Sequence, residues 1–154
     1  MNNKFWVGGA CSIVLLFLLL WRMPVVQFDF EDERYYLLET EFQLKWIHSV
    51  EKEEWLEFYE RKSDKLLLTE TKFKTYGAGV PSDGEIIPSD DGFVHMKINH
   101  PYKEMNLTVS QNAQTTITTA NKEILLYEYT KDYEFVTITI EWINLWEYVR
   151  GNKL

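Results

Sequence analysis

The sequence of 154 residues predicts an all-β domain, an antiparallel sandwich or partly open barrel of about eight short strands. We expect one N-terminal transmembrane helix before it and a short C-terminal helix after it. Apolar and polar residues alternate over 42–50 and again over 135–141, which is the period of a β-strand. Between these stretches, Gly, Pro, Asn, Asp and Ser separate short runs of β-branched and aromatic residues, and this spacing is typical of a sandwich or barrel.

The N-terminal segment predicts a membrane anchor over residues 1–24. Residues 5–21 form a run of 17 residues without a charge, flanked by Lys4 and Arg22, which is the lower limit for a spanning helix. No pair of small residues suited to signal peptidase follows the run, and Cys11 precedes its most apolar part instead of ending it. We therefore expect an uncleaved anchor in the membrane, with a cleaved signal peptide as the alternative.

Charge indicates where the rest of the chain lies. Lys4 and the free amino group outweigh Arg22, which favours a cytoplasmic N-terminus and an extracytoplasmic domain. The other 14 Lys and Arg residues stand against 24 Asp and Glu, a net charge of −10 beyond the anchor. Such a domain repels nucleic acid and anionic lipid headgroups. Cys11 is the only cysteine, so the β-domain, residues 25–141, forms no disulfide.

The strands of the β-domain follow from its alternating segments. Residues 25–30 fit a short strand or a stalk, and residues 54–61 fit a strand better than a helix because they are aromatic and follow a predicted hairpin partner. In 66–76 we expect Leu67, Thr69, Thr71, Phe73 and Thr75 to share one face, and residues 99–102 to form a turn. The remaining strands are expected at 42–50, 93–98, 105–110, 115–119, 123–130 and 135–141.

Residues 142–154 form a C-terminal extension with a different period. Trp142, Leu145, Trp146 and Val149 are spaced as on one face of a short helix. Two interpretations stay open at this point. The helix is either a lid that packs this face over an open end of the sheet, or an aromatic surface for the membrane or a membrane partner.

Two short motifs carry a family resemblance. Residues 48–51 read HSVE and residues 77–81 read GAGVP, with predicted strands between them. This pair resembles the bacterial family DUF1850, whose members combine HSVE with a downstream GAGLP, so that Val80 replaces a leucine. The resemblance covers about residues 40–140. Members are uncharacterised, but their genes often lie beside permeases of the tripartite ATP-independent periplasmic class with TAXI-type solute-binding proteins (TRAP-TAXI). The resemblance therefore implies an accessory role in solute uptake.

The acidic residues after the first motif raise the question of a metal site. His48, Glu51, Glu54 and Glu57 are spaced three apart, and such side chains bind divalent cations. A cation site, if any, would use His48, Glu51, Glu57 and Glu70, the last from a facing strand. The simpler interpretation is that His48 hydrogen-bonds Glu51 or Glu57 and holds the hairpin together.

Catalysis and cofactor binding receive little support. Ser49 neighbours His48, but adjacent strand residues point to opposite faces, and no G-x-S-x-G motif occurs. A hydrolase would need a cleft with a perturbed carboxylate. The 77–81 loop lacks the Lys-Ser/Thr pair of a phosphate-binding loop. We expect no cofactor and no enzyme.

The leading hypothesis is an extracytoplasmic binding domain that contacts a transport component. A small-ligand or cation-binding domain is the alternative. We interpret 77–81 either as a turn required by the fold or as a backbone surface that meets a ligand or partner. The residues expected at the recognition edge are His48, Ser49, Glu51, Trp55, Glu57, Gly77, Ala78, Gly79 and Pro81.

Overall fold

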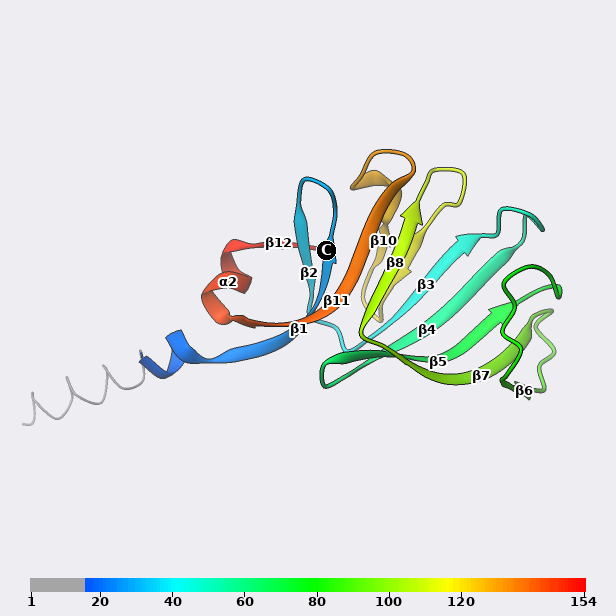
Figure 1. Ribbon diagram of the computed structural model, residues 1–154, viewed down its shortest axis with the longest axis horizontal. Coiled ribbons are helices and arrows are strands. Elements are labelled where there is room, and N and C mark those ends of the chain that lie inside the picture. Colours follow the sequence, from blue (N-terminus) through cyan, green and yellow to red (C-terminus); the bar gives the residue numbers. More distant parts are fainter. Residues whose placement is uncertain (1–15) are drawn as a thin grey trace, which may run out of the picture.

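The computed structural model describes residues 16–154, which form twelve strands in two sheets with a short C-terminal helix (Figure 1). The prediction of an all-β, sandwich-like fold is confirmed, whereas the expected number of about eight strands is too small. The strands are β1 (Arg22–Asp29), β2 (Arg34–Leu37), β3 (Glu41–Ile47), β4 (Glu54–Lys62), β5 (Lys65–Phe73), β6 (Glu85–Ile87), β7 (Val94–Tyr102), β8 (Glu104–Val109), β9 (Thr116–Thr118), β10 (Glu123–Leu125), β11 (Glu134–Asn144) and β12 (Asn152–Lys153). A 3-10 turn, η1 (Leu126–Glu128), follows β10, and helix α2 (Leu145–Arg150) follows β11.

The smaller sheet is built around the pairing of β1 with β11. Its order is β12-β2-β1-β11-β8, and every pairing is antiparallel except that of β12 with β2. The larger sheet has the order β10-β9-β3-β4-β5-β7-β6 and is antiparallel throughout. The predicted hairpins of β3 with β4 and of β9 with β10 are both present.

The main core lies where the two sheets face each other. Val26 and Phe28 of β1 and Ile138 of β11 contribute from the smaller sheet, while Phe42 and Leu44 of β3 contribute from the larger one. All five side chains are buried. In β3 and β11 the polar neighbours of these residues point away from this layer, and this alternation accounts for the packing of one sheet on the other. In β1, Val25 belongs to a second, smaller cluster with Tyr36 and Ile143.

A bulge corrects the predicted face of β5. Pairing of β5 with β4 and with β7 shifts register around Thr69, whose hydroxyl donates to the carbonyl of Phe58 at 3.0 Å. Thr71 and Phe73 share a face as predicted, and this face is buried, but beyond the bulge Leu66 and Leu68 are the residues that lie on it. The prediction that Leu67 and Thr69 share the face of Thr71 and Phe73 was therefore wrong, because one extra residue inverts the alternation on the other side of the bulge.

The turn expected at 99–102 is also absent from its predicted place. Strand β7 continues through Asn99 to Tyr102, and Asn99 takes a positive φ of 57°. Short polar residues tolerate this conformation. Pro101 lies where β6 no longer pairs with β7, so its missing N–H costs no ladder hydrogen bond on that side.

The C-terminal extension contains a shorter helix than expected, and its last residues contact the smaller sheet. Trp142 belongs to β11, and α2 spans six residues. The amide of Leu154 donates to the carbonyl of Tyr36 at 3.1 Å, and the Leu154 side chain is buried. Tyr148 is the α2 residue that packs against the sheet, on Val25 and its neighbours. The last residues are thus part of the smaller sheet.

The predicted lid face does not pack. Trp142, Leu145, Trp146 and Val149 are all exposed, because Tyr148 on another side of the helix makes the contact with the sheet. The lid interpretation of this apolar stripe is therefore wrong. The other interpretation, an aromatic surface for the membrane or a membrane partner, stays a prediction.

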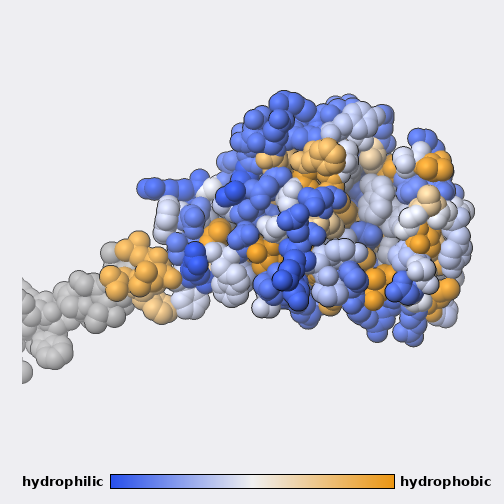
Figure 2. Space-filling view, viewed as in Figure 1, coloured by the Kyte–Doolittle hydropathy of each residue, from blue (hydrophilic) through white to orange (hydrophobic). Residues whose placement is uncertain are grey.

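The predicted anchor at residues 5–21 falls largely outside the described residues. Residues 16–20 are helical, and Figure 2 shows the apolar residues that precede β1 as an orange projection at one end of a mostly hydrophilic surface. Within residues 16–154, no helix combines the length and the apolar composition that a bilayer crossing requires.

Candidate functional site

The HSVE motif forms the turn between β3 and β4. Strand β3 ends at Ile47, and the turn is closed by hydrogen bonds from the His48 amide to the Glu53 carbonyl (2.8 Å) and from the Lys52 amide to the His48 carbonyl (3.0 Å). The prediction that the strand continues to Val50 was wrong. The chain leaves the ladder after Ile47, and Val50 is consequently 69% exposed at the tip.

A single carboxylate joins this turn to the GAGVP loop. The Glu51 carboxylate pairs with His48 Nδ1 through one oxygen, and its Oε1 accepts a hydrogen bond from the Ala78 amide at 3.3 Å. A Cβ added to Gly77 would overlap the same carboxylate. His48, Glu51, Gly77 and Ala78 therefore form one contact group, which we call the junction. Its presence explains why the loop has glycine at 77.

Aromatic rings support the junction from the inner face of the larger sheet. Trp46 of β3 and Trp55 of β4 are directly opposite in register and stack with centroids 5.6 Å apart. The His48 ring lies 5.4 Å from Trp55, and Phe73 lies 5.2 Å from both Trp55 and Tyr76. The predicted recognition residue Trp55 is buried and packs against the His48 ring of the junction, and direct contact of Trp55 with a partner stays a prediction.

The GAGVP loop closes this end of the sheet. Val80 packs on a cluster of Trp55, Phe73 and Met96 that is separate from the main core. Gly79 has a φ of +82° and its Cβ position is open, so the loop needs glycine there for its backbone conformation. These contacts support the interpretation of the loop as a turn required by the fold. The other interpretation, a backbone surface that meets a ligand or partner, stays a prediction.

The surface around the junction is partly apolar. Val50 in the turn and Tyr76 beside the loop are both more than 60% exposed. Ser49, Ala78 and Gly79 are exposed, and Pro81 is half-buried. Among the described residues Ser49 makes no side-chain hydrogen bond with His48, whose Nδ1 faces Glu51.

The four residues expected to share a cation are not brought together. His48 and Glu51 meet in the junction, but Glu57 and Glu70 point to opposite faces of the larger sheet, since Glu57 is paired with Thr71 and Phe58 with Glu70. Residues 16–154 contain no group of three or more His, Cys, Asp or Glu side chains that could hold a metal ion. Glu70 is the residue next to Thr71, the partner of Glu57, and adjacent strand residues point to opposite faces. Glu57 and Glu70 therefore cannot share one cation.

Glu70 instead belongs to a pair of contacts around His95. His95 Nδ1 lies 3.1 Å from Glu70 Oε1, and its Nε2 lies 2.8 Å from Asp91 Oδ2. This cluster was not predicted, because Asp91 comes from the long loop before β7. The pairing of β5 with β7 brings Glu70 near His95. This register depends on the bulge in β5, which the sequence did not show.

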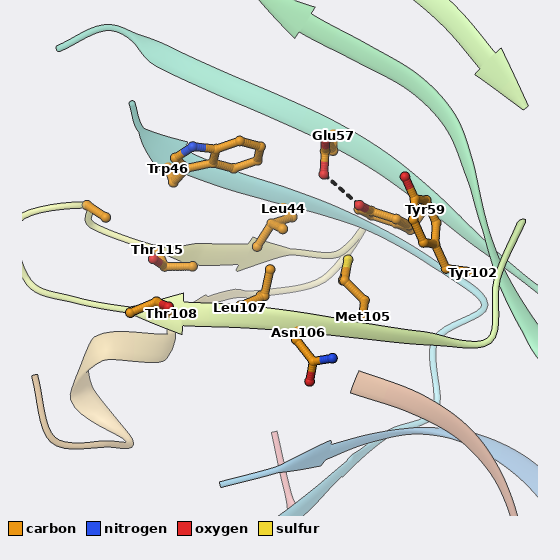
Figure 3. A pocket seen from close by; sticks show the side chains of 11 residues that line it. Leu44, Trp46, Glu57, Tyr59, Tyr102, Met105, Asn106, Leu107, Thr108 and Thr115 are labelled. Atoms are coloured by element: carbon orange, nitrogen blue, oxygen red, sulfur yellow. Dashed lines mark hydrogen bonds between the residues drawn. The ribbon is translucent and has the colours of Figure 1, made fainter. Parts of the chain in front are cut away.

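Glu57 lies at a second place, in a cavity of about 360 Å³ between the two sheets. Figure 3 shows its carboxylate beside the hydroxyl of Tyr59, which donates a hydrogen bond of 2.5 Å, with Trp46 and Tyr102 nearby. Burial raises the pKa of Glu57, and the Tyr59 hydroxyl partly offsets this. Glu57, one of the residues expected at the recognition edge, therefore lies in this cavity and not in the junction. Tyr59 and Tyr102 were missed.

Comparison with known proteins gives a family. The family model described as a domain of unknown function, DUF1850, matches residues 42–126, which is more than half of the chain. The chain therefore belongs to this family, and the resemblance found in the sequence is confirmed. Neither the curated proteins nor the solved structures yielded a match.

Proposed function

We propose that this protein is a membrane-anchored binding domain that recognises a partner protein outside the cytoplasm with the junction and the apolar residues around it. The partner we propose is a component of a TRAP-type solute transporter, which rests on the genomic association implied by the family resemblance. Affinity would come from Val50 and Tyr76, and the polar loop backbone would give specificity.

The main support for this proposal is that the N-terminal apolar residues and the junction lie at opposite ends of the molecule (Figure 1). The apolar residues that precede β1 lie at one end of the longest axis, and the β3–β4 turn lies at the other (Figure 1). A domain attached through its N-terminus would therefore present the junction away from the bilayer. Val50 and Tyr76, both largely exposed, would then be available to a partner outside the membrane.

The exposed stripe of α2 supports the attachment. Arg22, the first residue of β1, is paired with Asn144, the residue before α2. Trp142 and Trp146 therefore lie within a few residues of the N-terminal apolar segment, in a region where amphipathic rings are favoured at the headgroup level. An interfacial position for α2 accounts for an apolar face that nothing in the described part of the chain covers.

Site-specific photo-crosslinking in intact cells tests the proposal. A photoreactive phenylalanine replaces Val50 or Tyr76 in the full chain, and the control carries it at Phe135, which is exposed on β11. We expect a discrete adduct from positions 50 and 76 that contains a transporter subunit or a solute-binding protein. No specific adduct from either position, or the same adducts from position 135, would refute the proposal.

A further inference from the structure

The cavity between the sheets has a largely apolar wall with a single carboxylate. Leu44 and Trp46 of β3, and Met105 and Leu107 of β8, line it from the two sheets. Its volume of about 360 Å³ lies within the range of small-molecule sites. Figure 3 shows Leu44, Met105 and Leu107 converging on the space from both sides, whereas Asn106 points away from it.

Glu57 is the polar centre of this cavity. Its strand position, opposite Leu44 on β3 and Thr71 on β5, directs the side chain inward between core residues. Tyr59 is its one hydrogen-bond donor among residues 16–154, and it reaches one of the two carboxylate oxygens. A carboxylate in an apolar wall is costly without a cationic partner.

The protein does not supply that cation within the cavity. None of the residues lining it, all of which belong to the described part of the chain, is Lys, Arg or His. Trp46, Tyr59 and Tyr102 line the cavity together with the carboxylate, and aromatic faces attract organic cations. The net charge of −8 for the whole chain also raises the local concentration of cations.

We propose that this cavity binds a small protonated organic amine, with its ammonium group on the Glu57 carboxylate and its apolar body between Leu44, Trp46, Met105 and Leu107. The raised pKa of Glu57 is the cost of burying the carboxylate in the free protein, and an ammonium partner removes this cost. An anionic ligand would be repelled by the Glu57 carboxylate. A neutral apolar ligand would leave that carboxylate without a cationic partner. The site is separate from the junction, so this inference does not rest on the proposed function.

Calorimetric titration of the full chain in lipid nanodiscs tests the inference with three probes of one shape. The probes are phenethylammonium, 2-phenylethanol and 3-phenylpropanoate. We expect phenethylammonium to bind at least about tenfold more tightly than 2-phenylethanol, since charged hydrogen bonds are the stronger ones. We expect 3-phenylpropanoate not to bind. Equal binding of the three probes, or none by phenethylammonium, would overturn the inference.

Two variants and one matched control locate the binding. Glu57→Gln keeps the shape and removes the charge, so we expect about a tenfold or greater loss of amine affinity. Glu60→Gln, on the same strand but facing outward, should leave the affinity unchanged. Leu107→Trp fills the cavity from β8 and should abolish binding of amine and alcohol alike. Thermal melts confirm that each variant is folded. Unchanged affinity in folded Glu57→Gln or in folded Leu107→Trp would refute the site.

Discussion

The carboxylate of Glu51 accepts a hydrogen bond of 3.3 Å from the amide of Ala78, 27 residues further along the chain. The same carboxylate pairs with His48 and occupies the space that a side chain at residue 77 would need. The HSVE and GAGVP motifs therefore depend on each other physically. One motif supplies the acceptor, and the other supplies the exposed amide and the missing Cβ.

Replacing Gly77 by alanine should destabilise the protein by about 1–3 kcal/mol, the usual cost of overpacking. The new Cβ displaces the Glu51 carboxylate from both of its partners. In a Glu51→Ala background the same substitution should cost much less, because the obstacle is gone. Urea unfolding of the two single variants and the double variant gives the coupling energy. Additive effects would contradict a direct contact.

Replacing Thr71 by valine should cost about 1–3 kcal/mol, because it leaves a buried donor without its acceptor. Trp55 Nε1 donates to Thr71 Oγ1 at 2.8 Å, and Thr71 is fully buried. Thr108→Val, at an exposed position of β8, is the matched control and should be nearly neutral. Thermal or urea unfolding measures both variants, and equal effects would show that the hydrogen bond contributes nothing.

Replacing Glu57 by glutamine should stabilise the free protein at neutral pH. Burial raises the pKa of Glu57, so the folded state binds more protons than the unfolded state between the ordinary and the raised pKa. Across this window the free energy of unfolding of the wild type falls as pH rises, and above it the loss is complete. Glutamine has no charge to bury at any pH.

The pH dependence of that difference is the measurement. The variant should gain stability over the wild type as pH rises through the window, and the gain should then level off. Urea unfolding across the window measures it, with Glu60→Gln as the control because Glu60 lies on the other face of β4. A difference that does not vary with pH, or a less stable variant above the window, would contradict the assignment.

An environment-sensitive dye attached to α2 should show whether this helix lies at the membrane surface. In a Cys11→Ser background, a single cysteine replacing Trp146 carries an environment-sensitive label, and the control carries it at Phe135. We expect a blue shift at position 146 alone when the full chain is transferred from detergent to nanodiscs, because an interfacial ring is partly removed from water. Equal spectra at the two positions would place α2 away from the membrane.

The strand pattern was the most predictable part of the structure. Alternation around Phe42 and Leu44, and over β11, identified the strands and their buried faces because both sheets have one apolar side. The bulge at Thr69 was not predictable, because residues 66–68 are all leucine and either alternation places leucine on the buried face. Strands β6 and β12 were not predicted, because three and two residues are too few to show a period.

The site was predicted in part. The two motifs identified the junction, but the strand pattern could not show that His48 leaves the ladder or that one carboxylate reaches both motifs. The acidic residues were misleading as a group. Glu51, Glu57 and Glu70 look equivalent in the sequence, yet a turn, an inward strand position and an outward one place them in three different environments.

Crosslinking from position 50 with the junction intact and broken tests the central claim most directly. In intact cells, the photoreactive residue at Val50 should give one discrete adduct with the wild-type junction, and Glu51→Ala should abolish it while the chain remains folded and present in the membrane. An adduct of equal yield in both backgrounds, or none in the wild type, would contradict a recognition surface built on Glu51 and the GAGVP loop.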